Sequence, residues 1–398
     1  MNHLLHHIHH LQQALYLAQE SLWITSPNPR VGCIITNACG QVLGQGHTQR
    51  AGGPHAEIMA LQDAQDNGCS VKGATAYVTL EPCSHMGRTG PCCNALIAAG
   101  IHRVFATHTD PNPLVSGQGI ARLRAAGIEV IVLPPDDPLA VATRELNIGF
   151  FSRMIRHKPW VRMKLAASLD GKTALDNGIS QWITSPEARA DGHAWRARSC
   201  AVLTGIGTVL ADNPRLDVRW VETPRQPAVV VIDSRLETPP DAALFMAGRA
   251  CTLYAAVQND LKKSALEERG AQVIYLPLQN GRVDLVAMLH DLARREINEL
   301  HIEAGEKLNG ALIRDNLVDE FLVYLAPKLI GQGRGMAQLG TFDSLVQALS
   351  LEFRQTDRVG PDLRIVARAC GRDTLALVQL NLDSSVDHLL SSLNRYEN

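Results

Sequence analysis

The chain has 398 residues, of which 45% are hydrophobic and 20% are charged, and its formal net charge is −2. A chain of this length can bury a large core, and two domains are the expected number. Because its basic residues are scattered, the electrostatic attraction behind non-specific nucleic-acid binding is missing, and small-molecule chemistry is favoured.

No apolar run reaches the roughly 18 to 20 residues of a membrane span, and the N-terminus lacks the basic-then-apolar order of a signal peptide. The nine cysteines are unevenly spaced and odd in number, which is not typical of a disulfide framework. We therefore expect a cytoplasmic protein that acts neither on nucleic acid nor on membranes. Its cysteines are expected to be core residues or metal ligands.

The opening segment combines histidines with helical periodicity. Its histidines are His3, His6, His7, His9 and His10. Apolar residues recur at intervals of three and four, at Leu4, Ile8, Leu11 and Leu15. This spacing predicts an amphipathic first helix whose histidines face water, and the alternative is a metal site on one helical face.

From Val31 to Leu133, short apolar runs alternate with helical patterns, which favours an α/β layer with a largely parallel sheet. The pattern starts afresh after residues 146–158 and repeats, so the second half is predicted to be another α/β domain. We place the first domain at residues 1–148, the second at 149–370 and a tail at 371–398. The tail has helical spacing in its last third and is interpreted as a packing or oligomer helix.

The segment "GGPHAEIMAL" holds the first chemical motif, in which His55 and Glu57 directly follow Pro54. Proline is favoured in the first turn of a helix. Residues two apart in a regular helix point about 200° apart, so His55 and Glu57 can address one point only at the irregular start of a helix. The motif therefore fits a helix N-terminus.

Two Pro-Cys pairs follow in "EPCSHMGRTGPCC", with Cys83 and Cys92 separated by residues 84–91. One histidine and two thiolates leave the fourth tetrahedral position of zinc for water, as in catalytic sites. Glu57 would then carry protons to a ring nitrogen and a departing amine. Apart from the long spacing, this is the H-x-E…P-C-x-x-C signature of zinc nucleobase deaminases.

The second half offers two glycine-containing segments. In "CAVLTGIGTVL", Gly205 and Gly207 follow a strand, but Leu210 stands where a dinucleotide fingerprint has its third glycine. In "IEAGEKLNGALI", Gly305 ends a strand and Gly310 lies in the next helical stretch. Backbone N–H groups at the start of that helix are suited to a phosphate.

Motifs along residues 11–368 resemble, in order, those of the bifunctional riboflavin-biosynthesis deaminase/reductase family. They are "PNPRVG", "PHAE", "TLEPCSHMGRTGPCC", "DPNP", "KLAASLDGKTA", "SQWITS", "TVLADNP", "VIDS", "IEAG" and "APKLIG". The resemblance implies a cytidine-deaminase-like α/β/α layer followed by a dihydrofolate-reductase-like α/β domain, with Zn²⁺ and NADPH as cofactors. It also implies deamination of 2,5-diamino-6-(5-phosphoribosylamino)pyrimidin-4(3H)-one and then reduction of the ribosyl side chain to ribityl.

For the first domain, the resemblance assigns zinc to His55, Cys83 and Cys92 and the proton shuttle to Glu57. It assigns the ribose phosphate to His85 and Arg88, and the pyrimidine pocket to Asn28 and His47. Cys93 is the competing ligand. Because neighbouring helical side chains diverge by about 100°, only one of Cys92 and Cys93 can face the metal.

For the second domain, the resemblance places Lys164 and Asp212 near the hydride-transfer centre, although either residue would also suit a structural ion pair. The substrate contacts it implies are Ser180, Arg196, Leu216, Arg219 and Glu303. The NADPH contacts it implies are Ala166, Trp182, Thr208, Asp212, Ser234, Gly305, Glu306, Lys307, Leu308, Asn309, Gly310 and Ala311. Ala166 stands where the family can have glycine.

The implied partners are small phosphoribosyl pyrimidines and, in a homo-oligomer, other copies of the chain. Two alternatives compete with this interpretation. One is a deaminase of nucleic acid or free nucleotides whose second domain binds substrate. The other is a zinc-stapled scaffold without turnover.

Overall fold

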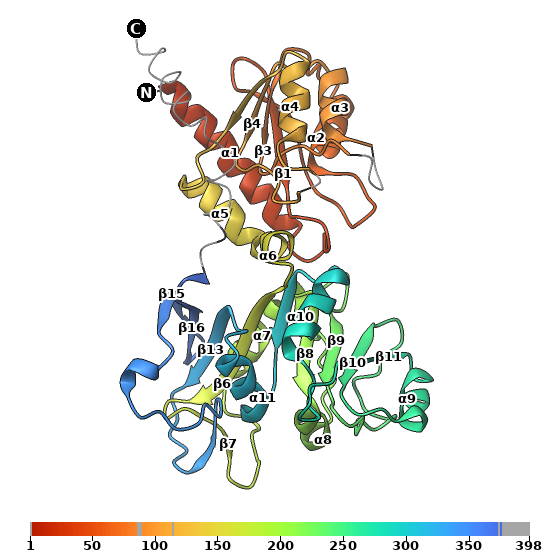
Figure 1. The fold of residues 1–398 in the computed structure, drawn as a ribbon. Coiled ribbons are helices and arrows are strands. Elements are labelled where there is room, and N and C mark those ends of the chain that lie inside the picture. The colour runs from red at the N-terminus through yellow and green to blue at the C-terminus, as the bar shows by residue number, and fades with distance from the viewer. Residues whose placement is uncertain (1, 86–89, 114, 373–374, 376–398) are drawn as a thin grey trace. The chain divides into compact units, whose positions relative to one another are not determined.

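The computed structural model describes residues 2–85, 90–113, 115–372 and 375, and it gives side chains from His6 onward (Figure 1). The chain divides into two compact units between Arg156 and His157. The sequence-based boundary between residues 148 and 149 lies at the start of α6 (Ile148–Arg156). Within the described part of the chain, no helix is both long enough and apolar enough to cross a membrane.

The first unit is built on a five-stranded sheet of order β2-β1-β3-β4-β5. Its strands are β1 (Gly32–Thr36), β2 (Val42–His47), β3 (Thr75–Val78), β4 (Arg103–Ala106) and β5 (Glu129–Val132). Its other helices are α1 (Asn2–Glu20), α2 (Ala56–Asp66), α3 (Cys92–Ala98), α4 (Gln118–Ala125) and α5 (Pro138–Leu146). β3, β4 and β5 are parallel as predicted, but β1 is antiparallel to both neighbours. The glycine-containing strand β2 was not predicted, because "VLGQGH" lacks a strong apolar run.

Helices cover both faces of this sheet, with α2, α3 and α4 on one face and α1 and α5 on the other (Figure 1). Two glycines let the helices approach. A Cβ at Gly32 would lie 1.9 Å from the carbonyl oxygen of Ala14 in α1, and one at Gly44 would lie 2.2 Å from that of Ala60 in α2. Close contact between helix and strand therefore fixes where α1 and α2 lie.

The expectation that the histidines of the first helix face water is wrong for His7 and His10. The His7 ring stacks on Phe105 at a centroid distance of 4.4 Å, and its Nδ1 is 2.7 Å from the hydroxyl of Tyr77. The His10 side chain is buried. These positions share a helical face with Leu11 and Ala14, which pack on the sheet, so α1 buries them with its apolar residues.

The second unit is built on a nine-stranded sheet of order β11-β10-β9-β8-β12-β6-β13-β16-β15. Its strands are β6 (Trp160–Ser168), β8 (Ala201–Gly205), β9 (Ala228–Ile232), β10 (Cys251–Ala255), β11 (Ala271–Tyr275), β12 (Glu299–Ile302), β13 (Glu320–Ala326), β15 (Leu351–Val359) and β16 (Asp362–Ala369). In this spatial order, the strands from β11 through β10, β9, β8, β12 and β6 to β13 are all parallel. The last two strands, β16 and β15, are antiparallel and form one edge of the sheet. A separate ribbon pairs β7 (Lys172–Leu175) with β14 (Gly333–Gly335).

Five helices and a short 3₁₀ turn complete the described part of this unit. They are α7 (Pro186–Arg198), α8 (Ile206–Asp212), α9 (Asp260–Glu267), α10 (Leu285–Arg294), α11 (Glu306–Arg314) and η1 (Leu345–Gln347). Residues alternate between the faces of β6, so Met163 and Leu165 enter the apolar core while Lys164 and Ala166 face the other way. That second face carries the polar groups described below.

Candidate functional site

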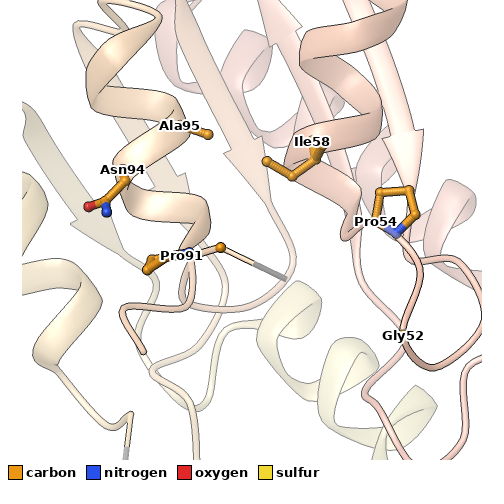
Figure 2. A pocket seen from close by; sticks show the side chains of 7 residues that line it. Gly52, Pro54, Ile58, Pro91, Asn94 and Ala95 are labelled. Atoms are coloured by element: carbon orange, nitrogen blue, oxygen red, sulfur yellow. The ribbon is translucent and has the colours of Figure 1, made fainter. Parts of the chain in front are cut away.

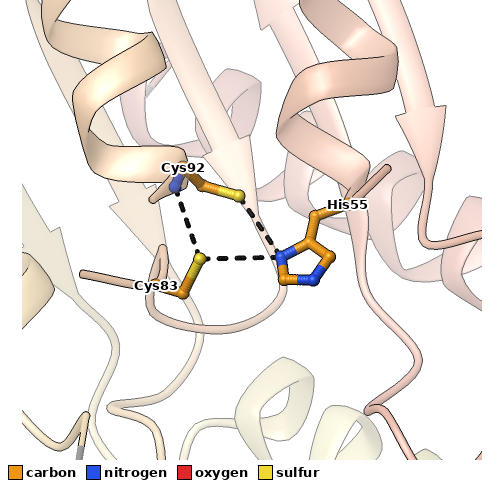
Figure 3. Close-up of side chains that lie close together, drawn as sticks. All are labelled: His55, Cys83 and Cys92. Atoms are coloured by element: carbon orange, nitrogen blue, oxygen red, sulfur yellow. Dashed lines mark hydrogen bonds between the residues drawn. The ribbon is translucent and has the colours of Figure 1, made fainter. Parts of the chain in front are cut away.

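His55, Cys83 and Cys92 converge in the first unit (Figure 3). The Nδ1 atom of His55 lies 3.6 Å from the sulfur of Cys83 and 3.3 Å from that of Cys92. One potential ligand atom from each residue lies within 4.8 Å of the others. One imidazole and two thiols at this spacing fit the donor set of a catalytic zinc ion.

Two helix starts and one strand end create this convergence. His55 is the extended N-cap of α2, and α3 begins at Cys92 directly after Pro91. Cys83 follows β3, and its sulfur accepts a hydrogen bond of 3.3 Å from the backbone N–H of Cys92. A helix N-terminus favours negative charge, so it supports the thiolate form of Cys83.

The adjacent Cys93 points elsewhere. Its side chain is completely buried, and its sulfur lies 3.9 Å from the side-chain oxygen of Asn94. Among the described histidine, cysteine and acidic side chains, the group close enough to share a metal contains Cys92 and excludes Cys93. The 100° step between helical neighbours separates the two thiols.

The electrostatics of this cluster favour proton transfer near neutrality. The pKa of Cys83 is lowered, first by the hydrogen bond with the Cys92 thiol and then by that with His55. Glu57 lies in the first turn of α2 and is 3% exposed. Burial, followed by the charge of Cys83, raises the pKa of Glu57 to about 7.

Glu81 was quoted within a sequence motif but given no role, and the structure makes it the anchor of a neighbouring loop. Its Oε2 accepts hydrogen bonds from the backbone N–H groups of Asp110 (3.0 Å) and Gly117 (2.9 Å). Its Oε1 accepts them from Gly119 (2.8 Å) and Ile120 (3.1 Å). This buried carboxylate therefore joins the segment carrying Cys83 to the loop that begins with "DPNP".

Asp110 opens that loop and is itself buried. Burial raises its pKa to about 7, with further contributions from Glu81 and Cys83. A charge at Asp110 in turn raises the pKa of His55, although the hydrogen bond with Cys83 is the largest cause of that shift. Only the tertiary structure reveals this electrostatic interaction between Asp110 and His55, because the two residues are far apart in sequence.

A pocket of about 540 Å³ lies beside the cluster (Figure 2). Pro54 and Pro91 line it, and each directly precedes a candidate ligand. The full lining is Gly52, Pro54, Ile58, Gly90, Pro91, Asn94 and Ala95. The pocket therefore lies between the starts of α2 and α3, next in sequence to two of the candidate ligands.

The predicted substrate residues of the first unit lie outside that lining. His47 is the last residue of β2 and pairs with Gly32 on β1. The carbonyl of Gly32 accepts a hydrogen bond from the backbone N–H of Thr79, which directly follows β3. His47 therefore lies at the end of the sheet from which the chain leads on to Cys83. Asn28 is half-buried in the turn after α1, and His85 is exposed. Arg88 lies outside the described residues.

In the second unit, the carboxylate of Glu303 contacts two other predicted residues. Arg196 on α7 donates to both carboxylate oxygens of Glu303, with 2.9 Å between Nη2 and Oε2. Lys164 Nζ lies 3.8 Å from Oε2 of the same carboxylate. Burial opposes ionisation, but the charge and hydrogen bonds of Arg196 and then the charge of Lys164 hold the pKa of Glu303 well below its usual range. Burial lowers the pKa of Lys164, against the attraction of Glu303.

Two predicted cofactor segments lie against one another at the ends of the neighbouring parallel strands β8 and β12. A Cβ at Gly205 would lie 3.1 Å from the Leu308 side chain, and one at Gly305 would lie 3.9 Å from the hydroxyl of Thr208. Gly305 is the extended N-cap of α11. Open α/β sheets bind ligands at such strand ends, so the placement suits a nucleotide.

Several residues of the α11 turn support the backbone around it. Asn309 Nδ2 donates to the carbonyls of Ala304 and Met336, both at 3.0 Å, while its Oδ1 is buried without a hydrogen-bond partner. Glu306 accepts from Gly335 N–H at 3.1 Å, and its Oε1 accepts from the side chain of Gln338 at 2.8 Å. The other predicted members behave differently: Gly310 packs against Gln338, whereas Lys307 is exposed and Ala311 half-buried.

Trp182 is 62% exposed, yet two basic side chains, those of Arg189 and Lys328, contact it. The guanidinium of Arg189 lies 4.4 Å from its ring centroid and 5.1 Å from that of Trp220. Lys328 Nζ donates to the carbonyl oxygens of Trp182 (3.0 Å) and Ile183 (2.7 Å). Sequence reasoning gave Arg189, Trp220 and Lys328 no role.

The other predicted reductase residues lie in diverse environments. Asp212 is the exposed last residue of α8, Leu216 is buried, and Ser180 and Ser234 are half-buried. Arg219 is exposed and paired with the buried carboxylate of Asp217, which Arg215 also contacts at 2.8 Å. Asp217 was missed in the sequence, since one aspartate between two arginines carries no specific signal.

Comparison with known proteins extends over both units. The family description "Cytidine and deoxycytidylate deaminase zinc-binding region" matches residues 5–108, and "RibD C-terminal domain" matches residues 159–365. The chain is 45% identical over 369 residues to the riboflavin biosynthesis protein RibD of Escherichia coli (strain K12), covering 89% of this chain and 97% of that protein. The corresponding protein of Haemophilus influenzae is 41% identical over 368 residues, covering 89% of this chain and 95% of that one.

Solved structures agree. Acinetobacter baumannii RibD superposes with a TM-score of 0.82 at 38% identity, covering 92% of this chain and 99% of that chain. A diaminohydroxyphosphoribosylaminopyrimidine deaminase/5-amino-6-(5-phosphoribosylamino)uracil reductase from Thermotoga maritima gives 0.80 at 29% identity, covering 93% and 100%. The chain therefore belongs to the RibD family of riboflavin biosynthesis, as a bifunctional enzyme that pairs a zinc-dependent deaminase with an NADPH-dependent reductase.

Proposed function

We propose that the first unit deaminates 2,5-diamino-6-(5-phosphoribosylamino)pyrimidin-4(3H)-one and that the second reduces the ribosyl side chain of the product to ribityl, giving 5-amino-6-(5-phosphoribitylamino)uracil. The observation that carries the proposal is the convergence of His55, Cys83 and Cys92 beside buried Glu57, in a chain whose second unit matches the reductase family. The name of the Thermotoga maritima relative supports this choice of substrate.

In the first unit we assign zinc binding to His55, Cys83 and Cys92. When bound, zinc supplies Lewis-acid activation of water. Glu57 accepts a proton from the attacking water, passes it to a ring nitrogen and supports departure of the amine as ammonia. Its buried carboxyl, with a pKa of about 7, suits both accepting and releasing a proton near neutrality.

Substrate recognition in this unit is assigned to Asn28 and His47 for the pyrimidine and to His85 and Arg88 for the ribose phosphate. His47 lies at the same sheet edge as the segment leading to Cys83, which supports its role. Arginine is suited to paired hydrogen bonds with phosphate oxygens.

In the second unit we assign NADPH to the adjoining turns that follow β8 and β12, together with Ala166, Trp182, Asp212 and Ser234. The residues assigned to these turns are Thr208, Gly305, Glu306, Lys307, Leu308, Asn309, Gly310 and Ala311. When bound, NADPH supplies the hydride. The chain supplies the orientation, because backbone N–H groups at the start of α11 are available to a phosphate.

The substrate of the second unit is assigned to Ser180, Arg196, Leu216, Arg219 and Glu303, with Lys164 and Asp212 managing protons at the reacting carbon. Glu303 holds Lys164 and Arg196 beside one another, which supports a shared site. Asp212 is exposed at the end of α8, so its role rests on the family resemblance.

We also assign a homo-oligomer to this chain, formed through β15 and the segment before it. Leu345 and Val346 are each 93% exposed and Phe353 is 73% exposed, on or next to the edge strand β15. Unpaired sheet edges readily accept another strand. Light scattering of Phe353→Ser should report a smaller mass than that of wild type. An unchanged mass would contradict this interface.

A cytoplasmic location completes the proposal. All nine cysteines are free thiols, and two of them belong to the proposed zinc site. A reducing compartment keeps such thiols available. Localisation of a tagged full chain to an oxidising compartment would contradict this assignment.

One coupled assay tests both activities. Zinc-loaded protein is mixed with NADPH and the diaminopyrimidinone, and ammonia and NADPH absorbance are followed together. Ammonia release followed by NADPH oxidation is expected. Comparable turnover of cytidine, dCMP or tRNA would contradict the substrate assignment.

The ligand assignment has a separate test. Cys92→Ser should lose zinc, whereas Cys93→Ser should keep it, because of these two neighbouring sulfurs the one that faces His55 is that of Cys92. Metal content of the two purified variants decides the matter. Zinc loss in the Cys93 variant alone would reverse the assignment.

A further inference from the structure

We propose a second transition-metal site on α1, formed by His6 and His10. The two Nε2 atoms face each other at 3.3 Å, and the rings meet edge to face at 84° with centroids 4.6 Å apart. The residues are one helical turn apart, so they project from the same face. This pair is separate from the zinc cluster assigned above.

The separation of the two nitrogens fits a shared metal ion. Zinc binds histidine nitrogen at about 2.0–2.1 Å, so two ligands at a tetrahedral angle have nitrogens about 3.3–3.4 Å apart. The observed 3.3 Å between His6 and His10 therefore matches two ligands of one ion.

The hydrogen bonding of His10 prepares it as a ligand. Its Nδ1 lies 3.0 Å from Oε1 of Gln13, an oxygen that only accepts, so Nδ1 carries the proton. The Nε2 lone pair then points toward His6. Metal-binding histidines usually donate their other ring N–H to an acceptor in this way.

The turn between β1 and β2 packs against the His6 ring. A Cβ at Gly40 would lie 1.6 Å from Nε2 of His6, so the His6 ring packs closely against this turn and any other residue here would displace it. Gly40 has a φ of +79°, and Asn37 Oδ1 fixes the turn by accepting from the N–H groups of Cys39 and Gln41, both at 3.0 Å. The absence of a side chain at Gly40 thus allows the His6 ring to sit where its Nε2 atom meets that of His10.

The His6–His10 pair lies near the opposite end of the sheet's strands from the zinc cluster. The turn bearing Gly40 follows Thr36, which pairs with Thr75, the first residue of β3. Cys83 comes after the last residue of β3, Val78. An ion at His6 and His10 is therefore remote from deamination.

The donors define the class of ion. Two imidazoles favour zinc, copper or nickel, whereas magnesium and calcium prefer oxygen ligands. The free thiol of Cys39 is exposed beside Gly40. Its sulfur does not form a three-ligand group with the two imidazoles in the described part of the chain, so water would complete the coordination.

Equilibrium dialysis of the full-length, zinc-loaded protein against free Zn²⁺ tests the site. Wild type should bind one equivalent more than His6→Gln. His9→Gln is the matched control, because His9 is exposed on the same helix outside the pair, and it should bind as wild type does. Equal stoichiometry in wild type and His6→Gln would overturn the proposal.

Two further measurements secure the outcome. Ammonia release by His6→Gln should equal that of wild type, which shows that the variant is folded and its first metal site intact. With Cu²⁺, electron paramagnetic resonance should show nitrogen coordination that disappears in His6→Gln but not in His9→Gln. Nitrogen coordination that persists in His6→Gln would also overturn the proposal.

Discussion

In the first unit the candidate ligands converge because two helices begin beside the end of one strand, whereas in the second unit ion pairs gather the candidate polar groups over a parallel sheet. His55 and Cys92 are placed by the backbone at the starts of α2 and α3. Arg196 and Lys164 are placed by the carboxylate of Glu303. The first site should tolerate the loss of a charge that does not hold its backbone, whereas the second should fail when one partner of its ion pairs is removed.

The first way to test this contrast is Glu57→Gln, which keeps the shape of the side chain but removes its capacity to carry a proton. We expect deamination to fall by about 10²–10⁴-fold, the usual contribution of general acid–base catalysis. Zinc content and reduction of the deaminated intermediate should stay unchanged, because the ligands are placed by backbone. Glu129→Gln, at an exposed position of β5, is the control. Near-normal ammonia release would show that Glu57 has another role.

Arg196→Leu probes the second site. Removing one partner of a fully buried ion pair typically costs about 3–5 kcal/mol. The cost here should be smaller, because the pair is partly exposed and Lys164 remains 3.8 Å from Glu303. The unfolding transition of the second unit should therefore move to lower denaturant concentration, and NADPH oxidation should be lost. Ammonia release should persist. The double variant Arg196→Leu/Glu303→Leu should recover part of the stability but not the activity, and failure to recover any would argue against the pair.

Glu81→Gln tests how far the first site depends on a carboxylate outside the ligand set. The amide of glutamine would place its NH₂ group, a hydrogen-bond donor, opposite two backbone N–H groups that are also donors. This mismatch should lower the free energy of unfolding by about 1–3 kcal/mol. We expect lower stability of the first unit and faster loss of zinc to a chelator, with reduction unaffected. Glu129→Gln, at the exposed position of β5 used above, serves for comparison. Unaltered zinc retention would mean that the loop beginning at Asp110 does not support the cluster.

The smallest effect is expected for Arg189→Leu, which removes the cation between Trp182 and Trp220. Cation–π contacts at exposed positions are worth about 0.5–1 kcal/mol, so KM for NADPH should rise by roughly 2- to 5-fold. The value of kcat should hold, since Arg189 orients a proposed cofactor contact. Arg269→Leu, an exposed change after α9, controls for lost charge. A fall in kcat at constant KM would point to a different function for this arginine.

Local motifs explain how much of each site could be predicted. His55, Glu57, Cys83 and Cys92 stand in short segments whose chemistry depends on where a helix or strand begins or ends, and that information lies within a few residues. Glu81 and Asp110 were quoted in motifs, yet their hydrogen bonds join residues far apart in the chain. Arg189 and Asp217 gave no signal, because a single charged residue is typical of any surface.

The fold shows the same division. The strands with continuous apolar runs, such as β3, β4 and β13, were predicted because burial on both faces demands such runs. β2 was not predicted, because its glycines interrupt the apolar run that would indicate a strand. The antiparallel direction of β1 was not apparent, because it depends on the short turn that joins β1 to β2. Burial of His7 and His10 likewise followed from how α1 lies on the sheet.

The sequence by itself determined which candidate groups are available: a histidine and spaced cysteines as candidate zinc ligands, a glutamate as the candidate proton shuttle, and a glycine turn before a helix as a candidate phosphate site. These signals are local, since donor type and backbone conformation depend on neighbouring residues. Only the tertiary structure decided that Cys92 and not Cys93 faces His55, that Glu303 joins Arg196 to Lys164, and that His6 faces His10 beside Gly40. Such choices depend on distances between segments, which are set by the packing of helices on sheets.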